Sequence, residues 1–374
     1  MIYLDNAATS YPKPLCVRLG VARALEGCGG NPGRSGHLMS IRSSEYVYKA
    51  REVIAGHIGF CCPERIVFTQ NATHALNFAI KGLITEPCHV IISNLEHNSV
   101  LRPVISLQGK IGVTYSVYDS RKPLKEEIEA HIKEDTKFII TTAVSNVTGA
   151  EINLKEISEI AKSHNLGLII DLSQYLGHRL LDVSDLHFSA LCAPSHKGLL
   201  GIMGGGFAVF NEGVSPVPIF EGGSGYDTLN PMMPSCLPER LEAGTVPTVA
   251  IISLIHGIGY IEKYGVSCIE KRMAQLCNYA SELLKELKFV KVYGAENGIV
   301  AFNVDGVGSG EVADLISTHG ICVRGGLQCS PVAHKAYNTL EQGMVRASFS
   351  VFNTKRDVDR LCNALLAEYK RGRR

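Results

Sequence analysis

A lysine and an aspartate in this chain lie in settings that suit one kind of chemistry. Lys197 follows a Pro-Ser-His segment, 194–196, and precedes the glycine-rich stretch 198–206, while Asp171 ends the otherwise apolar run 167–171. A lysine amine can hold an aldehyde cofactor as a Schiff base, and a carboxylate that ends a buried strand keeps a pyridine nitrogen protonated, so that the ring becomes an electron sink. The pair therefore indicates a pyridoxal phosphate site.

Further polar loops follow other predicted strands. The segment 68–77 places small and polar residues between a strand and a helical pattern, and free amides at such a helix start can hold a phosphate. His97, in another polar loop, could stack on a pyridine ring or relay protons. Asn146 and Gln174 follow two more strands. Because ligands in open α/β sheets gather outside the carboxyl ends of strands, we expect these loops to converge on one crevice.

The elements that must position these loops are short apolar runs that alternate with helical patterns. The predicted strands are 65–69, 89–93, 137–142, 167–171, 188–192 and 206–210. Such alternation is typical of a mostly parallel sheet that is covered by helices. The sequence therefore predicts an α/β fold for this part of the chain.

The character of the sequence changes from about Val246, where long amphipathic helices such as 267–287 begin to predominate. Short strands at 290–293 and 299–304 and a final helix near 355–369 complete this part. A chain of 374 residues is longer than one hydrophobic core usually supports.

We therefore expect two domains. The predicted large domain, residues 16–250, binds the cofactor, and a smaller α+β domain is formed by residues 1–15 and 251–374.

Composition and charge favour small-molecule partners. The formal net charge of +1 gives no electrostatic reason to bind nucleic acid or an anionic membrane. The first ten residues include a charge and polar groups where a signal peptide needs an apolar region, and no segment is apolar enough to span a bilayer. The basic end, 370–374, is interpreted as a solvated helix end.

The twelve cysteines show neither a Cys-x-x-Cys pair nor a regular framework. We therefore expect no metal site and no disulfide scaffold, and a reducing cytoplasm fits best. The adjacent pair Cys61 and Cys62 is interpreted as two small residues in a turn before Pro63.

In order along the chain, these segments resemble the class V aminotransferase branch of the fold-type I pyridoxal phosphate transferases, and within it the cysteine desulfurase/selenocysteine lyase family. The resemblance extends from end to end. The matching segments are 3–9, 31–37, 68–77, 96–99, 144–149, 171–174, 196–197, 242–245, 324–329 and 345–354.

The resemblance implies a role for each matching residue. It makes Lys197 the Schiff-base lysine, and it puts Asp171 on the pyridine nitrogen, Gln174 on the phenolic oxygen of the cofactor, and His97 on the ring face. Asn146 would lie beside the cofactor near the substrate. The phosphate would be held by Ala72, Thr73 and His196, and by Thr245 of the neighbouring subunit. The resemblance therefore implies a homodimer.

The loop 324–330 selects the reaction in similar enzymes. Its Cys329 stands between glycines and a proline, and Arg346 follows seventeen residues later. The planar fork of an arginine matches a carboxylate, so Arg346 is expected to hold an amino acid substrate, with Arg324 as its support or as a structural ion-pair partner. The resemblance implies that the Cys329 thiolate attacks the sulfur of L-cysteine, which leaves a persulfide and releases alanine, in the sulfur mobilisation that serves iron–sulfur cluster biogenesis.

Three segments depart from the family pattern. Ser195 stands one residue away from the usual hydroxyl before the lysine, Ala72 and His74 replace threonine and glutamate, and Gln328 replaces a histidine before Cys329. The short spacing to Arg346 resembles the group II enzymes, so we expect an acceptor protein to collect the persulfide.

Other functions stay open at this point. The chain could be a selenocysteine lyase acting on L-selenocysteine, or an enzyme of another class V reaction, such as transamination or epimerisation, in which Cys329 is incidental. A non-catalytic docking scaffold and a zinc-binding regulator are the alternatives from other classes.

Overall fold

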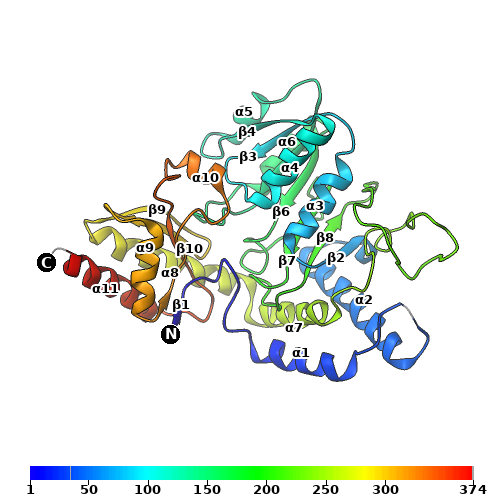
Figure 1. The fold of residues 1–374 in the computed structure, drawn as a ribbon, viewed down its shortest axis with the longest axis horizontal. Helices are drawn as coiled ribbons and strands as arrows, with labels where there is room; N and C mark the ends of the chain where they lie inside the picture. The colour runs from blue at the N-terminus through cyan, green and yellow to red at the C-terminus, as the bar shows by residue number, and fades with distance from the viewer. Residues whose placement is uncertain (34, 373–374) are drawn as a thin grey trace.

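A seven-stranded sheet forms the centre of the computed structural model, which describes residues 1–33 and 35–372 (Figure 1). Its strand order is β2-β8-β7-β6-β5-β3-β4, and every strand except β8 runs in the same direction. The strands are β2 (Ile66–Thr69), β3 (His89–Ser93), β4 (Thr114–Tyr118), β5 (Thr136–Thr142), β6 (Gly167–Asp171), β7 (Ala190–Pro194) and β8 (Gly206–Phe210). Arg34 of the 31–37 segment, and Arg373 and Arg374 of the basic end, lie outside the described residues.

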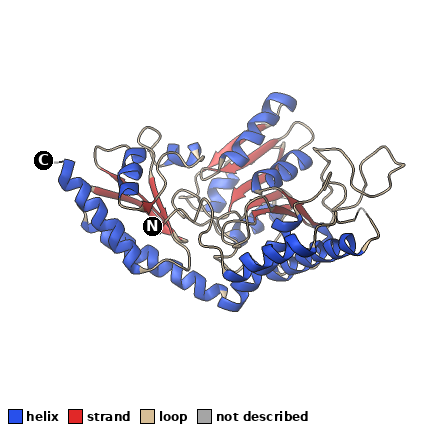
Figure 2. Ribbon diagram, turned by 60° about the horizontal axis from the view of Figure 1, so that its bottom comes forward, coloured by secondary structure: helices blue, strands red, loops and turns tan. Residues whose placement is uncertain are grey.

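Helices cover both faces of this sheet (Figure 2). In β3, Val90 and Ile92 pack into one layer, whereas Ile91 packs into the other, as the two-residue repeat of a strand requires. The first face is covered by α3 and α4, and the second by α2, α5, α6 and α7. These helices are α2 (Leu38–Ile58), α3 (Ala72–Leu83), α4 (Asn98–Ile111), α5 (Leu124–Glu129), α6 (Leu154–Ser163) and α7 (Thr248–Tyr264).

The C-terminal part is built on a three-stranded antiparallel sheet with the order β12-β10-β9. The N-terminal strand β1 pairs in parallel with β11, so the first residues of the chain lie beside this part. The strands are β1 (Ile2–Tyr3), β9 (Val290–Glu296), β10 (Ile299–Val304), β11 (Ile321–Cys322) and β12 (Val345–Ser348). The helices are α8 (Val266–Glu286), α9 (Ser309–Thr318), α10 (Pro331–Ala336) and α11 (Lys355–Gly372).

The expected domain boundary near residue 250 falls inside α7, which packs against α1 (Leu15–Gly27) and α2. The core residues Ile251, Leu254 and Ile258 of α7 share one hydrophobic cluster with both parts of the chain. The division into residues 16–250, and 1–15 with 251–374, therefore stays a prediction.

The predicted α/β architecture is confirmed. The strands predicted at 89–93, 167–171 and 206–210 coincide with β3, β6 and β8, and β7 begins two residues later than expected. Only β4 of this sheet has no predicted counterpart, because its sequence Thr-Tyr-Ser-Val-Tyr is polar and it lies at the sheet edge, where most of its residues are partly exposed. Within residues 1–33 and 35–372, none of the helices combines the length and the apolar character that crossing a bilayer requires.

Candidate active site

A pocket lies at the carboxyl ends of the parallel strands, where the polar loops were expected to converge. It is formed by the first residues of α3 and α4 and by residues at or after the ends of β5, β6 and β7. The lining residues are Asn71, Ala72, Thr73, His97, Ser99, Thr142, Val144, Asn146, Asp171, Ser173, Gln174, Pro194, His196 and Lys197. The set includes eight of the predicted site residues. The four that do not line the pocket are Cys329, Thr245, Arg324 and Arg346.

Lys197 and Asp171 both line this pocket. Asp171 is the last residue of β6 and is 4% exposed, and its Oδ1 accepts a hydrogen bond from Ser173 N at 2.9 Å. Burial lowers the pKa of Lys197 to about 8; the positive charges of Arg346 and Arg324 act in the same direction, and Asp171 opposes them. A useful fraction of the neutral amine, the form that attacks an aldehyde, is therefore present near neutral pH.

The start of α3 offers donors to an anion. The Asn71 side chain caps the helix by accepting a hydrogen bond from His74 N at 2.9 Å. The amides of Ala72 and Thr73, the first two residues of the helix, have no intrahelical acceptor. In the same pocket, His196 Nδ1 is buried without a hydrogen-bond partner among the described residues. Burial lowers the pKa of His196 to about 4, so the ring is neutral, and its Nδ1-protonated tautomer would offer an anion a third donor besides the two amides.

Ser195 does not contribute to that group of donors. Its hydroxyl is fully buried and faces the carbonyl oxygens of Ile202 and Gly205, at 2.5 and 2.8 Å, which compete for its one hydrogen. The displaced hydroxyl noted in the sequence thus holds the glycine-rich segment after Lys197.

His97 is the N-cap of α4, and this position fixes its tautomer. Its Nδ1 accepts a hydrogen bond from Ser99 N at 3.1 Å, so the proton of the neutral ring lies on Nε2. Burial lowers the pKa of His97 to about 4, which keeps the ring neutral. Gln174 is 3% exposed and donates through Nε2 to the carbonyl of Ala7 at 2.9 Å, which leaves one amide hydrogen for the pocket.

The Cys329 loop is attached to the rim of the pocket. The carbonyl oxygen of Cys329 accepts a hydrogen bond from Asn98 N at 2.7 Å, next to His97. Asn146 donates through Nδ2 to the carbonyl of Gln328 at 2.8 Å and accepts from Ser330 Oγ at 2.6 Å. The Cys329 side chain itself is exposed. Its loop is therefore held by the start of α4 on one side and by the pocket residue Asn146 on the other.

Arg346 is buried with an unexpected partner. Its side chain is 2% exposed, and Nη2 forms an ion pair with Asp5 Oδ1 at 2.7 Å while Nη1 donates to the carbonyl of Asn146 at 2.7 Å. Its Nε has no partner among the described residues. Arg324 supports Arg346 through the main chain, since each N–H donates to the carbonyl of the other. Among residues 1–33 and 35–372, the Arg324 side chain has no ion pair.

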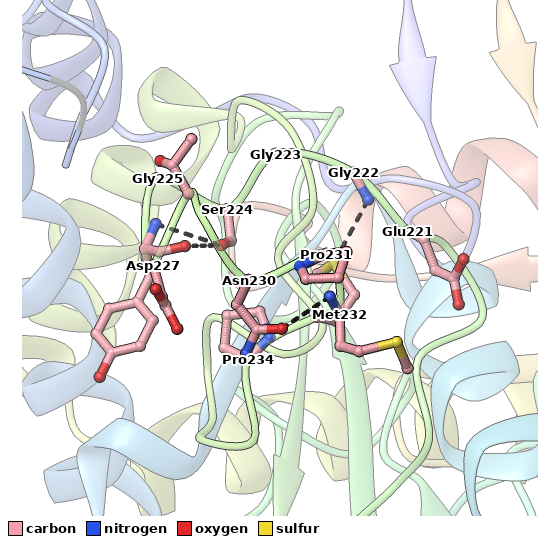
Figure 3. Close-up of a pocket in the computed structure, with 13 residues that line it drawn as sticks. Glu221, Gly222, Gly223, Ser224, Gly225, Asp227, Asn230, Pro231, Met232 and Pro234 are labelled. Carbon is pink, nitrogen blue, oxygen red and sulfur yellow. Dashed lines mark hydrogen bonds between the residues drawn. The ribbon is translucent and has the colours of Figure 1, made fainter.

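Thr245 lies outside the pocket of its own chain. Its hydroxyl accepts a hydrogen bond from Asn31 Nδ2 at 3.1 Å. The loop 221–234, which precedes it, encloses a separate cavity that contains none of the predicted site residues (Figure 3). The contact of Thr245 with the phosphate of a partner subunit stays a prediction.

Two charged residues near the site have no role in the sequence-based prediction. Glu96, which precedes His97, is fully buried. Its Oε1 accepts hydrogen bonds from Thr142 N, at 2.7 Å, and Ser93 Oγ, and its Oε2 has no partner among the described residues. Burial raises the pKa of Glu96 to about 8. Lys13 donates to the carbonyl of His196 at 2.8 Å, and burial lowers its pKa to about 8. Neither could be found from sequence, because both occur in polar segments that suggest exposure.

Comparisons with known proteins agree with this geometry. The sequence model of the family described as aminotransferase class-V matches residues 2–361. The chain belongs to the class V aminotransferase family. A probable cysteine desulfurase of Halalkalibacterium halodurans is 31% identical over 98% of this chain and 92% of its own length. A second probable cysteine desulfurase, from Methanothermobacter thermautotrophicus, is 29% identical over 97% and 94%.

A solved structure supports the same assignment. The apo structure of a cysteine desulfurase from Thermococcus onnurineus superposes with a TM-score of 0.90 at 30% identity and covers 99% of this chain and 95% of the other. The predicted fold and the predicted resemblance to cysteine desulfurases are therefore confirmed. The roles of the individual site residues stay predictions.

Proposed function

We propose that the protein is a pyridoxal phosphate-dependent cysteine desulfurase that converts L-cysteine to L-alanine and forms a persulfide on Cys329. The observation that carries this proposal is the attachment of the Cys329 loop to the pocket rim, through Asn98 N and the Asn146 side chain. A class V enzyme that uses no thiol would not need an exposed cysteine at this place. Relatives that match along nearly their whole length carry the same name.

The pocket residues fit the cofactor. The unbonded amides of Ala72 and Thr73 and the buried, unpartnered Nδ1 of His196 suit a phosphate group. Asp171 suits a protonated pyridine nitrogen, the neutral ring of His97 suits its flat face, and Gln174 suits the phenolic oxygen. Lys197 Nζ would hold the aldehyde. When bound, pyridoxal phosphate supplies an electron sink for the charge that develops on the substrate.

Arg346 would hold the substrate carboxylate. Its Nε–H is buried without a partner among the described residues. The positive charges of Arg346 and Arg324 both act on Lys197 and His97, which supports a role for them beside the substrate. Asp5 and the Asn146 carbonyl fix the plane of the guanidinium. Arg346 is thus oriented before the substrate arrives, which reduces the entropy lost on binding.

The chemical step transfers one sulfur atom. The Cys329 thiolate attacks the substrate sulfur, a sulfur–sulfur bond forms, and the bond between substrate Cβ and sulfur breaks. The electron pair of the broken bond stays on Cβ, which takes up a proton and becomes the methyl group of alanine. The neutral His97, protonated on Nε2, and Lys197, with its pKa of about 8, are the groups that can exchange protons in the pocket.

The persulfide on Cys329 would then pass to an acceptor protein, because Cys329 is exposed on a short loop. We also propose a homodimer in which Thr245 approaches the phosphate of the partner subunit. Large apolar side chains on α1 and α2 lie exposed and would be covered by such a partner. These are Leu15, Leu19, Leu25, Leu38, Met39 and Ile41. All twelve cysteines are free, which suits a reducing cytoplasm.

The test is the release of alanine and sulfide from L-cysteine by cofactor-loaded protein in the presence of a reductant. We expect equal amounts of both products, and we expect Cys329→Ala to lose them. Cys236→Ala is the matched control, because Cys236 is also exposed but lies outside the pocket and its rim. Bound cofactor without alanine from L-cysteine would overturn the proposal; cleavage of L-selenocysteine alone would favour a selenocysteine lyase.

A further inference from the structure

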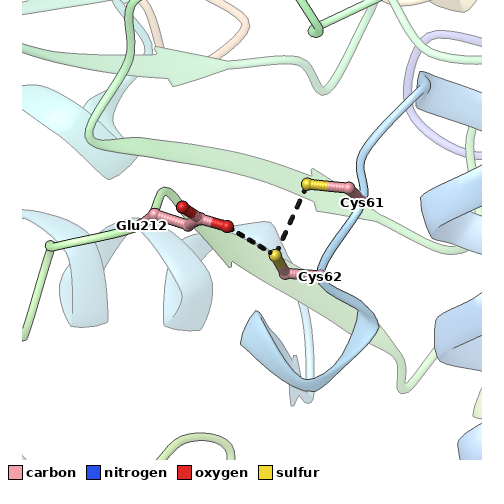
Figure 4. Close-up of side chains that lie close together, drawn as sticks. All are labelled: Cys61, Cys62 and Glu212. Atoms are coloured by element: carbon pink, nitrogen blue, oxygen red, sulfur yellow. Dashed lines mark hydrogen bonds between the residues drawn. The ribbon is translucent and has the colours of Figure 1, made fainter.

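A second cluster of reactive side chains lies outside the pocket, where Cys61, Cys62 and Glu212 converge (Figure 4). The two sulfur atoms are 3.5 Å apart, and Cys62 Sγ lies 3.0 Å from Glu212 Oε1. All three ligand atoms lie within 4.8 Å of one another. No other group of three or more histidine, cysteine or acidic side chains with this closeness occurs within residues 1–33 and 35–372.

The cluster lies at the amino-terminal ends of the parallel strands, whereas the pocket lies at their carboxyl ends. β8 runs antiparallel to β7, so Gly206 pairs with Pro194 near Lys197, whereas Phe210 pairs with Ala190 at the opposite end. Glu212 follows Phe210 by two residues. A ligand bound here would therefore be separate from the proposed desulfurase chemistry.

The backbone around the cluster is held on both sides. Cys62 precedes the short helix η1 (Pro63–Arg65) that leads into β2, and β2 pairs with β8 from Ile66 opposite Val209 onward. The Arg65 guanidinium donates from Nε to the carbonyls of Phe210 and Asn211, at 2.9 and 3.1 Å. The two segments that supply the ligands are thus joined by main-chain pairing and by an arginine, so the fold fixes the distance between their backbones.

We propose that Cys61, Cys62 and Glu212 bind a zinc-class divalent cation, with water as a fourth ligand. Zinc–sulfur bonds of about 2.3 Å at a tetrahedral angle put two sulfurs about 3.8 Å apart, and a sulfur and a carboxylate oxygen about 3.6 Å apart. The observed separations of 3.5 and 3.0 Å are shorter than these values by about 0.3 and about 0.6 Å, and Cys61 Sγ lies within 4.8 Å of Glu212. Side-chain rotation at the exposed ends of these residues can supply that change.

The charges of the cluster also favour a cation. The Cys62 thiol donates a hydrogen bond to the Glu212 carboxylate. That carboxylate and the Cys61 sulfur would both become ligands of the metal together with Cys62, so one cation would attract all three groups.

The sequence predicts no metal site, because the usual ligand spacings are missing. Glu212 lies 150 positions after Cys62, and only the antiparallel pairing of β2 with β8 brings them together. Two adjacent cysteines alone are more often structural than metal-binding. The third ligand is therefore the feature that changes the interpretation of this pair.

The test is metal binding by reduced, chelator-treated, cofactor-loaded protein. Calorimetric titration with Zn²⁺ gives the stoichiometry, and Co²⁺ gives thiolate-to-metal absorption bands that report sulfur ligands directly. We expect one metal per chain, loss of that metal and of the bands in Cys62→Ser and Cys61→Ser, and about tenfold weaker binding in Glu212→Gln. Cys236→Ser is the matched control. Cys236 also lies near one carboxylate, that of Glu239 at 3.7 Å, but among the described residues it belongs to no group of three possible metal ligands.

The outcomes separate this site from the active site. Metal binding that persists in Cys329→Ser supports the proposal, and binding that is lost there but persists in Cys62→Ser overturns it. Absence of bound metal in the reduced protein also overturns it. Circular dichroism and cofactor absorbance show whether each variant is folded, and Zn²⁺ should raise the Tm of the wild type but not that of Cys62→Ser.

Discussion

Replacement of Gln328 by leucine tests whether a buried network positions the cysteine that we propose as nucleophile. The Gln328 side chain is 5% exposed, and its Nε2 donates to the carbonyl of Met344 at 2.8 Å. Its Oε1 lies 3.0 Å from Nε2 of His334, a fully buried residue whose Nδ1 lies 2.9 Å from Thr339 Oγ1. Since Oε1 can only accept, His334 Nε2 carries the proton, and burial lowers the pKa of this ring, so it stays neutral.

The size of the effect follows from the groups that leucine leaves unpaired. Leucine has a similar volume but cannot bond to Met344 O or to the His334 N–H, and each buried unpaired group costs about 1–3 kcal/mol. The variant should therefore lose about 2–6 kcal/mol of local stability. Gln328 and Cys329 both have left-handed backbone conformations, with φ of 43° and 59°, which non-glycine residues adopt only when their surroundings hold them. Without the network, we expect the loop to leave this conformation.

The assay is kcat/KM for alanine formation, together with Tm. A loss of about 2 kcal/mol in positioning the thiol corresponds to a decrease of about 30-fold in kcat/KM. Gln342→Leu is the matched control. Its Nε2 also donates to main-chain carbonyls, those of Val304 at 3.0 Å and Val307 at 2.8 Å, and its Oε1 accepts from Asn303, so none of its side-chain hydrogen bonds within the described residues goes to the Cys329 loop. The control should lower Tm but change kcat/KM little. Equal kcat/KM in Gln328→Leu and wild type would refute the reasoning.

Three further predictions concern charged groups. Arg346→Lys keeps a charge near Asp5 but loses the planar guanidinium, so KM for L-cysteine should rise about tenfold or more while kcat changes less. An unchanged KM would show that Arg346 does not bind the substrate. Because the pKa of Lys197 is lowered from 10.5 to about 8, its neutral fraction grows as the pH rises through about 8. The rate at which cofactor-free protein takes up pyridoxal phosphate should follow this rise, as measured by absorbance with Lys197→Ala as the control. A rise centred near pH 10.5 would contradict the prediction. The folded-state pKa of Glu96 is raised from 4.5 to about 8, so the unfolded chain loses this proton first and stability falls between these pH values. Glu96→Gln should remove that loss, so the Tm of the variant minus the Tm of the wild type should increase from about pH 5 to about pH 8. Parallel plots of Tm against pH for the two proteins would contradict the raised pKa of Glu96.

The parts of the fold that sequence predicts best are the buried strands of the large sheet. The apolar run at 167–171 coincides with β6, because a strand that is covered on both faces has few polar positions. The polar strand β4 has no such signal at the sheet edge. For the site, the eight lining residues could be found from loops that follow strands, whereas the ion pair of Arg346 with Asp5 joins positions 341 residues apart. Contacts of this kind depend on how β1 and β12 approach each other, which no local pattern encodes.

Asn146 connects the two halves of the proposed chemistry. Its carbonyl accepts from Arg346 Nη1 at 2.7 Å, and its side-chain amide donates to the Gln328 carbonyl and accepts from Ser330 Oγ on either side of Cys329. An aspartate could not donate to Gln328, and an alanine could do neither, so the position requires a group with both a donor and an acceptor. Because Asn146 contacts both Arg346 and the loop that carries Cys329, the loop after β5 would set the distance between the substrate sulfur and Cys329 in the proposed reaction. The large sheet would thereby determine the geometry of a reaction whose thiol and arginine come from the C-terminal part of the chain.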